Sequence, residues 1–170
     1  MRGVTLLVPL LALSACASDV PRAVREAPVE SILPTTVLDA PATWRGHTVR
    51  WGGEIVGVEN HKQETWIEIV EKPLYSNGRP VRTDTSRGRI LAVVPGFLDP
   101  AVYAKQRSIT VVGVLENPTS RTIGEYSYRY PVVRASSHYL WPTEPETVYH
   151  YYYYDPWWPY PRRHYPPPRK

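Results

Sequence analysis

Short β-prone runs, each ended by glycine, proline or asparagine, fill the middle of this 170-residue chain. No long segment has the 3.6-residue hydrophobic period of a helix, and no internal repeat is evident. We expect strands in the run that starts at His47 and in the runs 65–71, 89–94, 108–115 and 126–139. Five or six short strands with glycine breaks predict an all-β fold, a small OB-like barrel, with a β-sandwich as the alternative.

Two features of the early strands bear on how the sheet would close. The Gly52-Gly53 pair stands within a β-prone stretch, which predicts a bulge or a sharp coil that bends the sheet toward a barrel. The run 65–71 alternates, which predicts a half-buried strand. One face of that strand would carry Thr65, Ile67 and Ile69, and the other would carry Trp66, Glu68 and Val70.

Helical signals are few and short. Asp99 followed by Pro100 is typical of an N-cap with proline at the first helical position, and it predicts one short helix that ends near Lys105. The run 35–45 predicts a helical turn, with Asp39 as its cap. Phe97, just before the predicted helix, is expected to plug the core.

The only cysteine, Cys16, follows an export signal rather than a folded segment. Arg2 supplies a positive start, Val4 to Leu13 is apolar but too short to span a bilayer, and small residues precede the cysteine. The sequence Leu13-Ser14-Ala15-Cys16 is similar to a bacterial lipobox, which predicts removal of residues 1–15 and acylation of Cys16. The alternative is an ordinary secretory signal. Ala17 and Ser18 rather than aspartate follow the cysteine, which favours sorting to the outer membrane.

Composition divides the remaining chain into three parts: a lipidated cysteine with a proline-interrupted tether (16–34), a β-barrel domain (35–142) and a tail (143–170). From Ala17 to Val148 there are 15 basic and 15 acidic residues, whereas Tyr149 to Lys170 has four basic residues and one acidic residue. The neutral body does not favour nucleic-acid binding. The tail is a candidate contact for an envelope protein or an anionic polymer, through Trp157, Trp158, Arg162 and Arg163, and a solvated, disordered end is the alternative.

No catalytic or metal-binding pattern stands out, so the sequence predicts neither an enzyme nor a cofactor. The five histidines are scattered, and no thiol remains once Cys16 is acylated. Ser136-Ser137-His138 could suggest a nucleophile and a base, but neighbours on a strand point to opposite faces, and we interpret the string as coincidence. Trp51 and Trp66 are candidate ligand contacts on a barrel face, although aromatic residues at such positions more often pack within the protein.

Several strings, in this order, resemble the Slp family of starvation-associated outer-membrane lipoproteins. They are Arg50-Trp51-Gly52-Gly53-Glu54-Ile55, Ile67-Glu68-Ile69 with Pro73-Leu74, Gly88-Arg89-Ile90-Leu91-Ala92, Gly96-Phe97-Leu98-Asp99-Pro100 with Tyr103, and Ile109-Thr110-Val111-Val112-Gly113. The resemblance spans roughly residues 35–141 and agrees with the lipobox. It implies a lipid-anchored envelope protein that faces the periplasm, is induced by starvation or stress in some members, and has no catalytic residues to carry over.

From these observations we expect a non-enzymatic structural or stress-related binding module of the Gram-negative outer membrane. The alternative is a barrel that binds a saccharide or another small envelope ligand. The expected partners are the membrane, through the acyl chains on Cys16, and an envelope component that contacts the tail.

Overall fold

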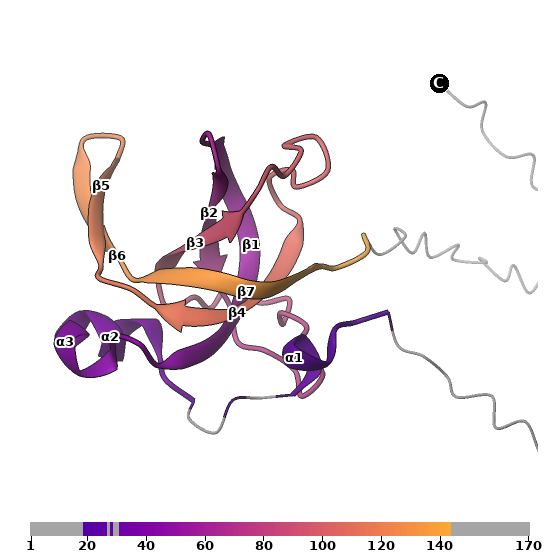
Figure 1. Ribbon diagram of the computed structural model, residues 1–170, viewed down its shortest axis with the longest axis horizontal. Coiled ribbons are helices and arrows are strands. Elements are labelled where there is room, and N and C mark those ends of the chain that lie inside the picture. Colours follow the sequence, from indigo (N-terminus) through magenta and orange to yellow (C-terminus); the bar gives the residue numbers. More distant parts are fainter. Residues whose placement is uncertain (1–18, 27, 29–30, 144–170) are drawn as a thin grey trace, which may run out of the picture.

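The computed structural model describes residues 19–26, 28 and 31–143 and shows a small β-barrel flanked by short helices (Figure 1). The helices are α1 (Arg22–Arg25), α2 (Pro34–Asp39) and α3 (Pro41–Trp44). The strands are β1 (Thr48–Asn60), β2 (Glu64–Glu71), β3 (Arg89–Pro95), β4 (Ser108–Leu115), β5 (Thr119–Ile123), β6 (Tyr126–Tyr130) and β7 (Val132–Leu140). Within the described residues, no helix is long and apolar enough to cross a membrane.

Five strands close the barrel in the order β1-β2-β3-β7-β4, and β4 returns to pair with β1. All neighbours are antiparallel except β3 and β7, which run parallel. The long strand β1 serves both ends of the sheet, because its residue Gly53 pairs with Glu71 of β2 on one side and with Ile109 of β4 on the other. This confirms the predicted all-β, OB-like barrel and excludes the sandwich.

The glycine pair of β1 allows a close approach of strands rather than a bulge. A Cβ atom on Gly53 would lie 1.9 Å from the Val70 carbonyl oxygen, and one on Gly52 would lie 2.7 Å from the Ile109 carbonyl oxygen. The break in β1 register falls later, between Ile55 and Gly57. The predicted bulge at the pair was therefore wrong in position, because the curvature there comes from strands packing against bare backbone.

The barrel interior holds one apolar core. Alternate residues of each strand point inward, and β2 follows the predicted alternation, with Thr65, Ile67 and Ile69 buried. The rest of this core includes Val49, Trp51, Ile55, Ile90, Ala92, Val94, Ile109, Val111, Leu115, Val133 and Ala135. Leu98 and Tyr103, from the β3–β4 connection, pack against one end of it.

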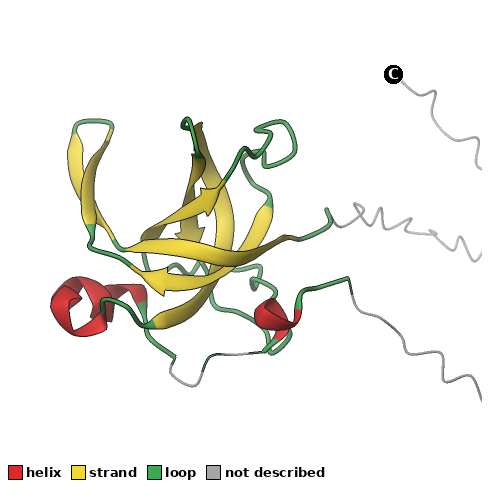
Figure 2. Ribbon diagram, in the orientation of Figure 1, coloured by secondary structure: helices red, strands yellow, loops and turns green. Residues whose placement is uncertain are grey.

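Strands β3 and β4 are buried on both faces, because other elements cover the outside of the barrel. The hairpin of β5 and β6 packs over Leu91 and Val93 of β3, with Tyr130 and Val132 in the same cluster. On the outside of β4, Val112 packs with Val24 of α1 and with Trp141. Figure 2 shows the hairpin and α1 on different sides of the barrel. The hairpin raises the strand number from the expected five or six to seven.

The predicted helix at 99–105 was wrong. Asp99 does act as a cap, since its Oδ1 accepts a hydrogen bond from the Ala101 N–H at 2.8 Å, but the segment forms only turns. Two inward contacts end the helical path: Tyr103 packs against the core, and the Gln106 N–H donates to the Ile55 carbonyl at 2.8 Å. Phe97 does not plug the core; it is 72% exposed, and Leu98 takes the inward position.

The helices lie near the N-terminal end instead. The run 35–45 contains a helical turn as predicted, but it splits into α2 and α3, and the N-cap of α3 is Ala40 rather than Asp39. The predicted tether is also not a free linker throughout. Val24 of α1 is completely buried, and the Arg50 guanidinium donates hydrogen bonds to the Val24 and Arg25 carbonyls at 3.0 and 2.9 Å. The buried Val24 side chain and the hydrogen bonds from Arg50 together hold this short helix against the barrel.

Candidate functional site on the outer face of β2 and β3

The outer face of β2 presents an indole surrounded by charged groups. Trp66 is half-buried, and its Nε1 donates a hydrogen bond to Glu64 Oε1 at 2.6 Å. The Arg121 guanidinium of β5 lies 5.1 Å from the Trp66 ring centroid, and the His61 ring, from the β1–β2 turn, lies 5.2 Å from it. In OB-type barrels this face, between the β1–β2 turn and the connection before the last strand, is where ligands bind.

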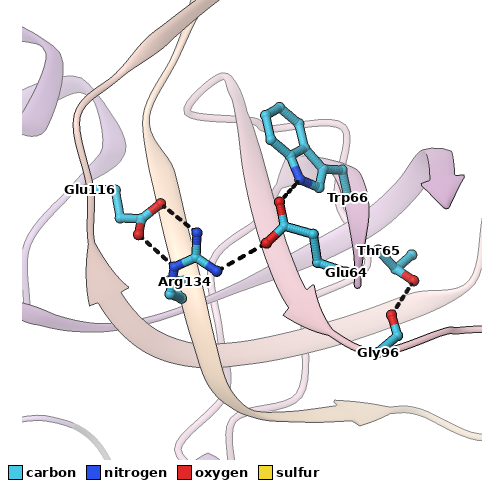
Figure 3. Close-up of polar contacts among 6 residues, drawn as sticks. All are labelled: Glu64, Thr65, Trp66, Gly96, Glu116 and Arg134. Atoms are coloured by element: carbon cyan, nitrogen blue, oxygen red, sulfur yellow. Dashed lines mark hydrogen bonds and ion pairs between the residues drawn. The ribbon is translucent and has the colours of Figure 1, made fainter. Parts of the chain in front are cut away.

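Arg134 of β7 joins this face to the loop after β4. Figure 3 shows its guanidinium between two carboxylates, with Nη1 3.1 Å from Glu64 Oε2 and Nε 2.5 Å from Glu116 Oε1. The hydrogen bond from Trp66, followed by the one from Arg134, lowers the pKa of Glu64 below its usual value. Glu64 is therefore held ionised at neutral pH, which suits an ion pair and does not suit a general acid.

A second network lies further along the same strands. Glu68 Oε1 accepts hydrogen bonds from Arg89 Nη1 at 2.6 Å and from the Tyr130 hydroxyl at 2.7 Å. Burial, together with the bond to Glu68, raises the pKa of Tyr130 to about 12. The Tyr128 hydroxyl accepts a hydrogen bond from the Arg89 backbone N–H at 2.9 Å, so Tyr128 ties the hairpin to β3 and Tyr130 ties it to β2.

Thr65 fixes the end of β3 from inside the barrel. Its Oγ1 lies 2.8 Å from the Gly96 carbonyl oxygen, a contact drawn in Figure 3, and it accepts a hydrogen bond from the Leu98 N–H at 3.0 Å. Gly96 has a positive φ of 83°, which lets the chain turn away from the strand here. The outer face therefore has a rigid support beneath it.

Comparison with known proteins identifies the family. The model of the outer membrane lipoprotein Slp family matches residues 13–166. The chain belongs to the Slp family. It is 30% identical to the Escherichia coli (strain K12) outer membrane protein Slp over 129 residues, which cover 74% of this chain and 68% of that protein. It is 35% identical to the uncharacterized lipoprotein YeaY of the same organism over 130 residues, 73% of this chain and 67% of YeaY. No solved structure matches significantly.

Membership confirms the resemblance seen in the sequence, and it places this protein among the outer-membrane lipoproteins. The matched segment includes the lipobox residues Leu13, Ser14 and Ala15 together with Cys16, as well as the tail residues Trp157, Trp158, Arg162 and Arg163. All of these lie outside the described residues. Their predicted roles in lipidation and contact stay predictions.

In this Slp family member the two predicted contact tryptophans of the barrel do not meet. Trp66 lies on the outer face, whereas Trp51 is buried and its Nε1 donates to the Ile32 carbonyl at 2.8 Å. Trp51 lines a separate cavity of about 200 Å³ beside Glu71 and Arg87. Glu71 Oε2 lies 3.2 Å from Arg87 Nε, and burial raises the pKa of this carboxyl despite the nearby guanidinium.

Sequence reasoning missed the ring contacts of Trp66 with His61 and Arg121, and it missed the pairing of Arg134 with Glu64 and Glu116 beside it. Gly124, between two β-prone runs, was the available signal for the hairpin that carries Arg121. The pairing of Arg134 with Glu116 had no such signal, because it depends on where β7 enters the barrel.

The Ser136-Ser137-His138 string is not assembled into a nucleophile and base. The Ser136 hydroxyl lies 3.2 Å from the Val112 carbonyl oxygen, and His138 Nε2 lies 3.0 Å from the Tyr103 hydroxyl. Burial lowers the pKa of His138. Among the described residues, no group of three or more His, Cys, Asp or Glu side chains is placed to hold a metal ion.

Proposed function

We propose that this protein is a periplasm-facing, non-catalytic module of the cell envelope, held in the outer membrane by acyl chains on Cys16. Family membership supports the location, and the lipobox supports the anchor. The tail, rich in tyrosine, tryptophan and arginine, would contact an envelope protein or an anionic polymer.

One structural observation supports a structural or binding role over catalysis. On and beside the outer face of β2 and β3, carboxylates are paired with cations: Glu64 and Glu116 with Arg134, Glu68 with Arg89, and Glu59 with Arg121. These pairs join β1, β2, β3, β7, the loop after β4 and the hairpin into one surface. Carboxylates paired in this way link neighbouring strands, which suits a structural or binding surface.

The anchor is tested by replacing Cys16 in the cell. Cys16→Ala should leave an unprocessed precursor without lipid, because the peptidase requires an acylated thiol at the cut. Ser14→Ala is the matched control, since it keeps a small residue beside the cut and should be processed normally. Intact-mass measurement of the membrane fraction distinguishes the forms. A mature, acylated product from Cys16→Ala would refute the anchor.

Orientation has a separate test. Protease added to intact cells should leave the protein whole, and it should cleave the protein once the outer membrane is permeabilised. Cleavage in intact cells would show that the protein faces outward.

A saccharide ligand is the second candidate, favoured by the half-buried Trp66 on the face that OB-type barrels use for binding. Titration of the protein with peptidoglycan fragments, followed by tryptophan fluorescence and by melting temperature, tests it. Trp66→Ala should remove the response. Trp44→Ala should keep it, because the Trp44 ring packs against the barrel core and His47 rather than beside Trp66. No response in the unmodified protein would exclude these saccharides as ligands.

A further inference from the structure

The packed part of the chain begins very soon after the predicted lipidation site. Val20 already packs against the cluster of Val24, Val112 and Trp141 on the outside of the barrel. Arg25 Nε donates to the Val20 carbonyl at 3.1 Å, and Arg50 holds the next carbonyls of α1. Gly78 lies so close that a Cβ atom there would be 2.3 Å from the Val24 carbonyl oxygen. Helix α1 is therefore part of the folded body.

The linker between the predicted acylated residue and the folded body is therefore very short. Three peptide units join Cys16 to Asp19, and consecutive Cα atoms are about 3.8 Å apart, so Asp19 lies within roughly 11 Å of the acylated residue. That reach is somewhat longer than the Debye length of about 8 Å at physiological ionic strength, beyond which exposed charges are screened. The linker is therefore short enough to hold α1 near the bilayer surface, where its charges can approach the headgroup phosphates.

The surface at this point has the composition of a membrane interface. We define the anchor edge as residues 19–26 with α1, the neighbouring Arg50 of β1, the turn Tyr75–Arg79 and the end of β7 with Trp141. Its cations are Arg22, Arg25, Arg50 and Arg79. Its acidic residues are Asp19 and Glu26, and Glu26 pairs with Arg22 at 2.8 Å. Aromatic side chains accompany them: Tyr75 is 54% exposed, and Tyr139 is half-buried and stacks edge-on against the buried Trp141, at 4.9 Å between ring centroids. Arginine together with accessible tyrosine suits the headgroup region of a bilayer.

The other end of the described chain leaves from the same edge. Trp141 belongs to the cluster that holds Val20 and Val24, and Figure 1 shows the end of β7 and α1 on one side of the barrel. The hairpin of β5 and β6 lies on the opposite side. Both the segment leading to Cys16 and the basic tail therefore start at the anchor edge.

We infer that the anchor edge rests on the membrane, with its arginines against anionic phospholipid headgroups, so that the barrel has a fixed orientation and the hairpin side points away from the bilayer. This inference rests on the proposed lipidation of Cys16. It adds a second contact, made by the folded domain itself, to the contact made by the acyl chains.

The test compares two exposed tyrosines on opposite sides of the barrel. Tyr75→Cys and Tyr126→Cys each give one free thiol in the acylated protein, and Tyr126, on the hairpin, is 70% exposed. Each variant is labelled with a thiol-reactive fluorophore and reconstituted in phosphatidylethanolamine–phosphatidylglycerol vesicles that contain a nitroxide-headgroup lipid. Quenching should be severalfold stronger at position 75. Equal quenching at both positions would overturn the inference, because it would mean that the barrel rotates freely about the linker to Cys16.

A charge comparison tests the arginines. Arg22→Gln with Arg25→Gln should lower the quenching at position 75 severalfold, since each basic residue near an anionic surface adds to its attraction. Arg45→Gln with Lys62→Gln removes the same charge from exposed positions away from the anchor edge and should change it little. Equal effects of the two pairs would contradict the specific role of the edge. Intact-mass measurement before reconstitution separates acylation of Cys16 from contact of the anchor edge with the membrane. A protein without an acyl group would refute the acylation. An acylated protein whose barrel has no fixed orientation would refute only the contact of the anchor edge.

Discussion

At the scale of single residues, β1 depends on positions where nothing larger than glycine fits. Gly53 lies where β1 meets both β2 and β4, and its missing side chain lets the Val70 carbonyl approach. Gly57, four residues further along the same strand, has room for a methyl group, because an added Cβ atom would make only ordinary van der Waals contact with the Glu68 side chain at 3.4 Å. Two glycines that look alike in the sequence therefore have unequal roles.

Gly53→Ala should destabilise the protein by about 3 kcal/mol or more, because a backbone atom cannot move aside as a side chain can. Gly57→Ala should change the free energy of unfolding by less than about 0.5 kcal/mol. Urea denaturation of the two variants measures the difference. Similar losses in both would show that strand propensity, rather than the close approach, explains the glycines.

The pKa values of Glu71 and Glu64 are shifted in opposite directions. Burial raises the pKa of Glu71 above its ordinary value of 4.5, so this carboxyl stabilises the fold when protonated, and that contribution is lost as the pH rises through its folded pKa. Hydrogen bonds lower the pKa of Glu64, so its contribution is present above the unfolded pKa and is lost as the pH falls.

Glu71→Gln should therefore raise the melting temperature relative to the unchanged protein at neutral pH, with the gain disappearing toward the ordinary glutamate pKa. Glu64→Gln should lower it at neutral pH, with the loss disappearing in acid. Melting curves over this pH range test both signs. A loss for Glu71→Gln at neutral pH would mean that the ion pair with Arg87 outweighs the cost of burial.

At the scale of elements, the hairpin of β5 and β6 acts as a cover. Without it, Leu91 and Val93 would lie on the outer face of the barrel and be exposed to water. The hairpin buries both and is bound to β3 through Tyr128 and to β2 through the Tyr130–Glu68 bond. It therefore adds a second apolar cluster outside the barrel.

Leu91→Ala should cost about 2 to 5 kcal/mol, the range for a buried leucine, although the residue faces outward from the barrel. Val114→Ala is the matched control, since Val114 also faces outward, on β4, but is 41% exposed and should cost little. Thermal denaturation measures both variants. If Leu91→Ala lowered the melting temperature as little as Val114→Ala, the hairpin would not pack on β3 in solution.

At the scale of the whole molecule, the arginine-rich surface lies on the side of the barrel from which the segment leading to the predicted lipid anchor leaves. The body from Ala17 to Val148 has equal numbers of basic and acidic residues, and the excess lies in the tail. Within the balanced body, however, folding gathers four arginines at the anchor edge, where both ends of the described chain emerge. A neutral body can thus present a basic face to the membrane.

Deleting residues 149–170 from the acyl-free Cys16→Ala protein, expressed without residues 1–15, should weaken its association with anionic vesicles at low salt, because the excess positive charge is removed. Added salt should reduce the difference in vesicle association between the proteins with and without the tail. Co-sedimentation over a salt series measures it, with the melting temperature as the control for folding. Equal association with and without the tail at every salt concentration would exclude an electrostatic role for it.

Much of the barrel could be predicted because strands carry local signals. The run 108–115 coincides with β4, and the alternation of 65–71 gives the inward face of β2. The prediction of a helix after Asp99 was wrong. The cap at Asp99 is a local signal, whereas the packing of Tyr103 against the core is a tertiary contact. Of the candidate contacts, the sequence indicated Trp66 but could not separate it from Trp51, since the face to which each side chain points depends on strand register.

The sequence by itself determined the family, the all-β class and the excess charge of the tail, and it predicted the lipobox, because each of these depends on neighbouring residues or on composition. The tertiary structure decided that β3 runs parallel to β7, that the hairpin covers Leu91, that Arg134 joins Glu64 to Glu116, and that α1, six residues beyond the predicted anchor, packs on the barrel. These contacts join residues far apart in the chain, and no local preference specifies them; they follow from closing the barrel and from burying the apolar surface that closure leaves outside.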